Sequence, residues 1–239
     1  MKEGNTKRST AVWVTISGGV LIAAALIALY TPWLQLCDVR RVVVVGNHHA
    51  AAAEVASLSR ISRNDTIFSV SLTKAAQRIL EHPWVRNAVL KREFPHTLRI
   101  EIEERDVVAW SSSSSDDAVL LIGDSGVLLE LVETPPDVLE IEGARTSTET
   151  PGYQLLEHEI SSAIERLQFG VCGLTAARLN VEDLRSIELF LDNGPQVRLG
   201  DSATLSNSLD ALDALCGEID ISNFEQIDLR FGGEATLVP

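Results

Sequence analysis

A run of 23 residues without a charged side chain, Ala11 to Trp33, constrains this chain more than any other feature. A helix needs about 20 apolar residues to cross the hydrocarbon core of a bilayer, so the run predicts a transmembrane helix over 11–33. A cleaved secretory signal is the alternative, with Ala23-Ala24-Ala25 as the small residues before cleavage. Its apolar region would span only about 7 to 15 residues, so the run favours an uncleaved anchor.

The charges around the run predict its orientation. Lys2, Lys7 and Arg8 precede it, while Asp38 follows it before Arg40 and Arg41, so the positive-inside rule gives only a modest preference for a cytoplasmic N-terminus. A tail of residues 1–10 also leaves every foldable segment on the other side. We therefore expect a single-pass type II protein of the plasma (inner) membrane, with its C-terminal domains extracytoplasmic.

Charge is unevenly distributed along the chain. The formal net charge is −14. Residues 38–110 carry +2, whereas residues 111–239 carry six Arg against 24 Asp and Glu, a net −18. So acidic a region repels phosphate backbones, which argues against nucleic-acid binding and favours partners with basic segments.

Residues 38–110 show a compact alternation of element types. A β-branched run at 41–45 predicts a strand, and 50–59 and the segment after Ser71 predict two helices. Two further strands are expected at 85–92 and 97–105, where Leu98, Ile100 and Ile102 alternate with charged residues and predict one buried face. The predicted order is strand, helix, helix, strand, strand.

The remaining residues predict a second domain. Five consecutive serines, 111–115, are of low complexity and predict a flexible linker over 111–117. Residues 118–239 then predict strand pairs and helices in alternation, an α+β arrangement that we interpret as a helix-decorated antiparallel β domain. The expected elements are a hairpin at 118–131, a helix from Thr150-Pro151 to Gly170, a hairpin at 187–199, a helix at 205–216 and a terminal hairpin at 226–238.

The sequence Gly123-Asp124-Ser125-Gly126 matches part of the segment around the nucleophile of chymotrypsin-like serine proteases. A serine nucleophile requires a histidine base, and four of the five histidines, His48, His49, His82 and His96, fall in the first domain. Val127 also stands where the protease pattern has glycine. Asp-Ser-Gly between two apolar runs is typical of a hairpin turn, and we favour that interpretation.

No other enzymatic chemistry is supported by the sequence. His48 and His49 are adjacent and would point to opposite sides of an extended segment, and metal-ligand spacings and glycine-rich phosphate loops are missing from the pattern. We therefore expect no enzyme, cofactor, metal or small-molecule substrate. Cys37, Cys172 and Cys216 cannot all pair within one chain, so buried free thiols are the first expectation and a Cys172–Cys216 disulfide the alternative.

Several stretches together resemble one protein family. The words VVVVGN, NDTIFSVSL and EHPWVRNAVLKREFPHTLRIEIEER, directly behind a membrane anchor, resemble the POTRA domain of the bacterial cell-division family FtsQ/DivIB. The last words, QIDLRFGGEATLVP, resemble the strand with Asp-Leu-Arg near the end of that family's β domain. The resemblance implies a POTRA domain over 38–110, a linker over 111–117 and an FtsQ-type β domain over 118–239.

The resemblance also implies a function. Such a protein is a non-enzymatic scaffold of the divisome, which recruits and regulates septal peptidoglycan synthesis at the division septum. Its partners would be FtsB-like and FtsL-like proteins and other divisome membrane proteins. The alternatives are a POTRA-bearing, membrane-anchored export or assembly factor and a membrane-anchored serine hydrolase using Ser125.

The terminal hairpin is the expected partner site. It comes last in the sequence, so we expect an edge strand to which an extended partner segment can add by β-augmentation. The family's partner contacts correspond to Arg230, Phe231 and Gly233, and the final strand adds Ala235 and Leu237. Phe231 replaces a tyrosine common in the family, which keeps the ring and loses the hydroxyl.

Overall fold

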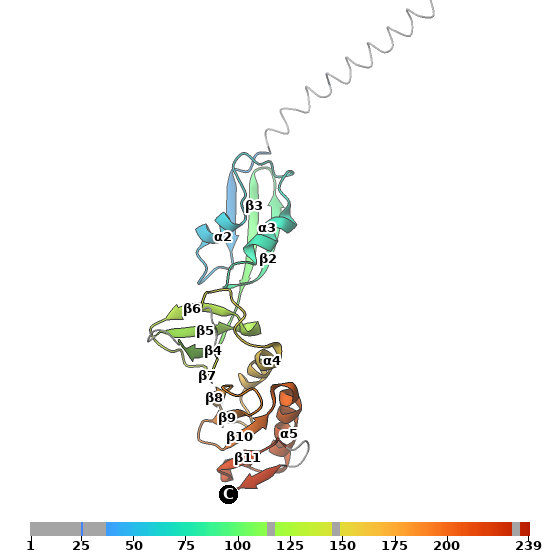
Figure 1. Ribbon diagram of the computed structural model, residues 1–239. Helices are drawn as coiled ribbons and strands as arrows, with labels where there is room; N and C mark the ends of the chain where they lie inside the picture. Colours follow the sequence, from blue (N-terminus) through green and yellow to red (C-terminus); the bar gives the residue numbers. More distant parts are fainter. Residues whose placement is uncertain (1–24, 26–36, 114–117, 145–148, 231–234) are drawn as a thin grey trace, which may run out of the picture. The chain divides into compact units, whose positions relative to one another are not determined.

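The computed structural model describes residues 25, 37–113, 118–144, 149–230 and 235–239 (Figure 1). The expected transmembrane helix over 11–33 lies outside these residues except for Ala25. Among the described helices, none is both long enough and apolar enough to span a membrane.

Two compact units make up the chain. The first unit comprises Met1–Ile79 and Asn87–Ile102, and the second comprises Leu80–Arg86 and Glu103–Pro239. The sequence placed this boundary at residue 110 and a linker after it. Instead Val107–Ser112 forms strand β4 of the second unit, and Ser111 is only 2% exposed. The serine run was misleading because its first members pair by their backbones with the following strand, as in Ser112 opposite Val119.

The first unit has the predicted element order. Strand β1 (Arg41–Val45) is followed by helices α2 (Ala52–Leu58) and α3 (Leu72–Ile79) and strands β2 (Val85–Glu93) and β3 (Thr97–Glu104). The strands form a three-stranded sheet in the order β1-β3-β2, with β1 parallel to β3. Leu98, Ile100 and Ile102 of β3 are buried, which confirms the predicted apolar face.

A glycine fixes the end of β1. Gly46 has a φ of +86°, and a Cβ atom there would stand 2.1 Å from the carbonyl oxygen of Ile102. No side chain fits so close to a backbone atom, so glycine is needed where the chain leaves β1 beside β3.

The second unit is built on a nine-stranded sheet with the order β12-β11-β10-β9-β8-β7-β4-β5-β6. Its strands are β4 (Val107–Ser112), β5 (Val119–Gly123), β6 (Leu128–Val132), β7 (Leu139–Glu142), β8 (Ala176–Asn180), β9 (Ile187–Leu191), β10 (Gln196–Gly200), β11 (Gln226–Asp228) and β12 (Thr236–Val238). The pairs β4–β7, β7–β8 and β10–β11 are parallel, so the sheet is mixed and the expectation of an antiparallel domain was wrong.

Two of the three parallel pairs, β7–β8 and β10–β11, have a physical cause in the connections. Helix α4 (His158–Leu167) lies between β7 and β8 in the chain, and helix α5 (Leu205–Glu218) lies between β10 and β11 (Figure 1). A crossover through a helix returns the chain in the same direction, which a tight hairpin cannot do. Both helices pack apolar side chains, such as Ile164 of α4 and Leu209 of α5, against the sheet. Strand residues such as Leu189 and Ile227 belong to the same core.

Helix α4 begins later than predicted. The sequence suggested a start at Thr150-Pro151, but residues 152–155 instead bond to the β5–β6 hairpin. Tyr153 O accepts from Leu128 N at 2.9 Å, and Leu155 N donates to Gly126 O at 2.9 Å. Gly152, with a φ of +91°, lies at the turn into this segment. These tertiary backbone bonds therefore displaced the helix start to His158.

Candidate partner-binding edge

Strand β12 ends one side of the nine-stranded sheet. It pairs antiparallel with β11 through Gln226 opposite Val238, Ile227 opposite Leu237 and Asp228 opposite Thr236. Within the described residues no strand pairs with its other side. The backbone groups on that side can therefore bond to an extended segment of another chain.

The side chains of β12 divide between the two faces of the sheet. Leu237 is half-buried and packs against the core of the second unit. Thr236 and Val238 are exposed, Val238 to 43%, as is the preceding Ala235. This alternation means that β12 is attached to the fold by one face and presents the other face to solvent.

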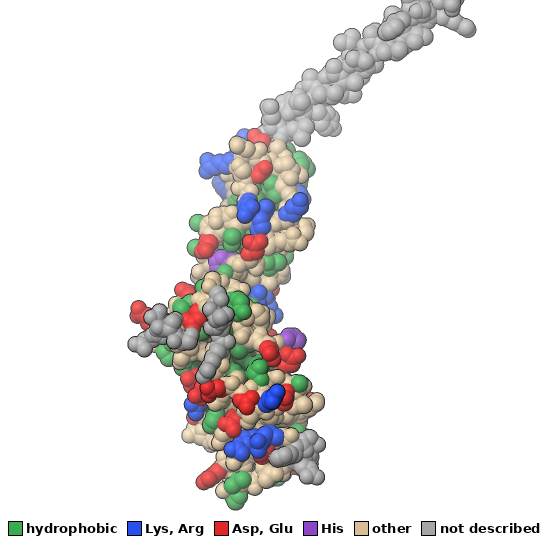
Figure 2. All heavy atoms as spheres, viewed as in Figure 1, with side chains coloured by type: hydrophobic (Ala, Val, Ile, Leu, Met, Phe, Trp, Pro, Cys, Tyr) green, Lys and Arg blue, Asp and Glu red, His purple; other side chains and the backbone are tan. Residues whose placement is uncertain are grey.

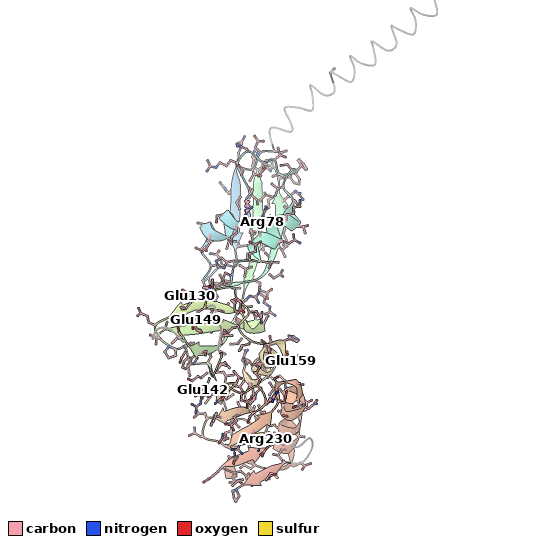
Figure 3. All side chains as sticks on the ribbon, in the orientation of Figure 1. Arg78, Glu130, Glu142, Glu149, Glu159 and Arg230 are labelled. Carbon is pink, nitrogen blue, oxygen red and sulfur yellow. A yellow bond between two sulfur atoms is a disulfide. The ribbon has the colours of Figure 1, made fainter. Side chains whose placement is uncertain are left out.

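Arg230 follows β11 (Figure 3) and is held by Asp228. Its Nη2 lies 2.6 Å from Asp228 Oδ2 and its Nε 3.0 Å from Asp228 Oδ1, while its backbone N–H donates to Oδ1 at 3.1 Å. The hydrogen bond from the Arg230 side chain lowers the pKa of Asp228, and the same bond raises the pKa of Arg230. The two side chains therefore stay charged, and Arg230 is held against the end of β11.

Charged pairs continue across the neighbouring strands. Arg198 Nε of β10 lies 3.3 Å from Glu188 Oε1 of β9, and Gln196 donates to Glu188 Oε2 at 2.9 Å. Further along the sheet, the guanidinium of Arg178 lies over the Phe190 ring at 4.4 Å. These arginines are already compensated within the unit, so the acidic excess of its surface (Figure 2) remains available to a basic partner.

The other end of the sheet differs because its edge is partly covered. Leu128 at the start of β6 bonds to the segment after the hairpin on both backbone atoms, donating to Tyr153 O at 2.9 Å and accepting from Gly152 N at 2.8 Å. Val127 also forms a bridge with Gln154. A partner segment would have to displace these bonds to extend along the whole of β6.

The partner residues proposed from the sequence are thus only partly described. Arg230, Ala235 and Leu237 lie around β12, whereas Phe231 and Gly233 fall outside the described residues. Sequence reasoning missed Asp228 as the group that positions Arg230. The signal was present, since alternate residues of a strand share a face and the pair is separated by Leu229 alone.

Ser125 lies in a turn, as the sequence favoured. Residues Asp124–Gly126 form a short 3₁₀ turn between the antiparallel strands β5 and β6. Asp124 is buried and forms ion pairs with Arg86 at 3.0 Å and Arg105 at 3.2 Å. The Ser125 hydroxyl lies 3.5 Å from Arg105 Nη1, and a guanidinium cannot act as a base toward it. This arrangement orders a hairpin and does not activate a nucleophile.

The cysteines correct an expectation. Cys172, after α4, and Cys216, near the end of α5, form a disulfide across a sequence separation of 44, where buried free thiols were expected first. Cys172 lies in a surface turn at a φ of 53°, so the thiol interpretation was wrong in burial as well as in pairing. In the described parts of the chain, no group of three His, Cys, Asp or Glu side chains could hold a metal ion.

Comparison with known proteins identifies the first unit. Residues 37–105 match the family described as POTRA domain, FtsQ-type. The chain is 27% identical over 238 residues to the cell division protein FtsQ of Salinibacter ruber, which covers 92% of this chain and 90% of the relative. It is 23% identical over 210 residues to the cell division protein DivIB of Solibacillus silvestris, covering 83% of this chain and 68% of the relative.

A third relative matches less of the chain. The FtsQ protein of Corynebacterium glutamicum is 26% identical over 130 residues, so the match covers 54% of this chain and 57% of the relative. The fold is therefore that of a protein with an FtsQ-type POTRA domain and a large mixed sheet. Residues 37–105 thus form an FtsQ-type POTRA domain, and the chain is similar over most of its length to cell division proteins named FtsQ and DivIB.

Proposed function

We propose that this protein is a non-enzymatic scaffold of the divisome. It is anchored in the plasma membrane by residues 11–33, and both units lie outside the cytoplasm at the division septum. It recruits and regulates the septal peptidoglycan machinery through FtsB-like and FtsL-like partners. The FtsQ-type POTRA domain and the similarity to FtsQ and DivIB proteins support the role in division, and the uncharged run supports the anchor.

The open edge at β12 is the observation that carries the partner site. It lies in an acidic region, and its own arginines near the edge are compensated by Asp228 and Glu188. An FtsB-like segment that adds a strand here would gain main-chain hydrogen bonds from β12, and its Lys or Arg side chains would meet a negative surface. Arg230, Phe231, Gly233, Ala235 and Leu237 are the proposed contact residues.

Photocrosslinking tests the geometry. A photoreactive phenylalanine analogue at Thr236 or Val238, whose side chains are exposed, should capture the FtsB-like partner co-expressed with the full chain. The matched control is the same analogue at Leu131, which is 37% exposed on the opposite edge strand, β6. Capture at Leu131 and not at β12 would move the site to the other end of the sheet.

A charge reversal tests Arg230. Arg230→Glu should weaken partner capture, because it places repelling carboxylates at Asp228 and at residue 230 and breaks the bond that holds residue 230 against β11. Arg178→Glu is the control, since Arg178 also pairs with a carboxylate, Glu142, but stands on β8. Equal losses in the two variants would mean that overall charge, and not this edge, governs binding.

Ser125→Ala separates the scaffold from a hydrolase. The scaffold predicts that a division-deficient strain complemented with this variant grows as it does with the unaltered chain. Loss of complementation at unchanged protein level would favour catalysis.

A further inference from the structure

We propose that the end of the first unit at which β1 begins is a membrane-contact surface, which rests on an anionic lipid bilayer with Phe68 and Phe94 at headgroup level. This inference rests on the membrane anchor in the proposed function. The folded first unit then makes a second attachment to lipid, in addition to residues 11–33.

Three segments meet at this end of the unit. The carbonyl of Cys37 accepts from Ile67 N at 2.8 Å, which joins the chain before β1 to the loop that precedes α3. His96 O, in the turn between β2 and β3, accepts from Arg40 N at 2.9 Å and from Arg41 N at 3.2 Å. The loop, the turn and the start of β1 therefore form one surface.

Two phenylalanines project from this surface. Phe68 is 57% exposed and Phe94 is 62% exposed, and their ring centroids are 5.5 Å apart. Arg92 holds the loop in place, because its Nε donates to Ile67 O at 2.7 Å and its Nη2 to Val70 O at 2.9 Å. The pair is thus built into the fold, and burial of its exposed rings in an interface would be favourable.

The charges beside the rings fit an anionic bilayer. Arg40, Arg41 and Arg63 are exposed and make no ion pair within the described part of the chain. Figure 2 shows Lys and Arg side chains at the end of the first unit where β1 starts. Four basic residues lie in or next to these segments, Arg40, Arg41, Arg63 and Arg92, against three acidic ones, Asp38, Asp65 and Glu93, and Glu93 is already paired with Arg99. Basic side chains within a Debye length of anionic headgroups are attracted to them.

The length of the chain brings this surface to the membrane. Trp33 ends the proposed transmembrane segment and Cys37 is four residues further on, so their Cα atoms are at most about 15 Å apart. The headgroup layer on each side of the hydrocarbon core is itself about 5 to 7 Å thick. If residues 11–33 span the bilayer, the surface therefore lies close to the lipid headgroups. A soluble protein partner would have to enter that narrow space, so lipid is the favoured occupant.

Photoreactive lipid tests the proposal on the full chain. The chain is placed in nanodiscs of phosphatidylcholine with phosphatidylglycerol, doped with a phospholipid that carries a diazirine near its headgroup, and labelled peptides are mapped by mass spectrometry. We expect label in 11–33 and in the peptides that contain Phe68 and Phe94. Phe68→Ser with Phe94→Ser should reduce the label in those two peptides to background and leave 11–33 labelled.

Two further variants sharpen the result. Val89→Ser changes another exposed apolar side chain of the first unit, 44% exposed on β2, and should leave the labelling unchanged. Arg40→Glu with Arg41→Glu should abolish the increase in label that phosphatidylglycerol causes over phosphatidylcholine alone.

The outcomes separate this inference from the anchor. Label in 11–33 without label at Phe68 and Phe94 would overturn the membrane-contact surface and leave the anchor standing. Label at the two phenylalanines without label in 11–33 would overturn the anchor and support the surface. Absence of label in both would overturn both.

Discussion

The two units of this protein form their sheets in different ways. In the first unit, three strands and two helices follow one another over about 70 residues, and the buried face of β3 is visible as a simple alternation of apolar and charged residues. In the second unit, β4 pairs with β7 and β10 with β11, so strands distant in sequence lie side by side. The first unit thus depends mainly on local pattern, and the second on long-range pairing and a disulfide.

The difference decides what the sequence could predict. Strands β1, β2 and β3 were predicted to within a residue or two because each has its own pattern of side chains. Strand β7, Leu139–Glu142, has four residues and was missed, since so short an alternation cannot be told from a loop. The parallel pairs were missed because pairing partners are set by tertiary packing, which leaves no local signal.

The partner site, too, could be predicted from the sequence only in part. The terminal hairpin and Arg230 could be selected from the sequence, as the apolar alternation ends there in a Gly-Gly pair. The strand order that leaves β12 at an edge could not, because an edge strand and a central strand of three residues have similar sequences. The partial cover on β6 depends on backbone bonds of residues 152–155, which were predicted to be helical.

A buried charge in the first unit should have the largest effect. Ile100→Asp puts a carboxylate at a fully buried position of β3 and should destabilise the first unit by roughly 4 kcal/mol or more. Hydrogen exchange of the full chain in detergent would show lost protection in peptides of residues 37–79 and 87–102. Val89→Asp, at a 44% exposed position, is the control. Equal loss in the two variants would mean that β3 does not face a core.

Loss of the disulfide should affect the second unit by the next largest amount. Cys172→Ser with Cys216→Ser removes a link across 44 residues, which stabilises the folded state by about 4 kcal/mol in a chain-entropy estimate and by less if strain enters. Thermal melting should be lowered to the same extent by reductant. Cys37→Ser, in the first unit, should leave that melting unchanged. A reductant-insensitive melting curve would contradict the pairing.

Two glycines with similar φ angles, +86° at Gly46 and +79° at Gly173, allow a direct comparison of the units. Gly46→Ala in the first unit meets a backbone oxygen and should cost about 2 kcal/mol or more. Residue 173 in the second unit has a φ of +79°, and nothing lies within 4 Å of the methyl group that Gly173→Ala would add. This substitution should therefore destabilise the fold only through the strain of a left-handed backbone, by about 1 kcal/mol. Chemical denaturation of both variants measures the difference. Equal destabilisation would show that the clash at Ile102 is relieved by a small shift.

Titration of Asp228 should give the smallest effect, and it tests the β12 edge of the second unit. Because the side-chain bond from Arg230 lowers the pKa of Asp228, the folded state gains stability above the unfolded pKa, about 3.9, and loses it as the pH falls through the lowered folded value. The pair therefore stays intact from neutral pH to about pH 4, and partner binding at β12 should not change over that range through this group. Carbon-13 NMR of the side-chain carboxyl measures the pKa directly. Arg230→Gln should raise the pKa of Asp228 toward its ordinary value, whereas Arg178→Gln, three strands away, should leave it unchanged. A pKa of Asp228 that does not respond to Arg230→Gln would mean that residue 230 is not held by this ion pair, and that the edge is positioned by strand pairing with β11 alone.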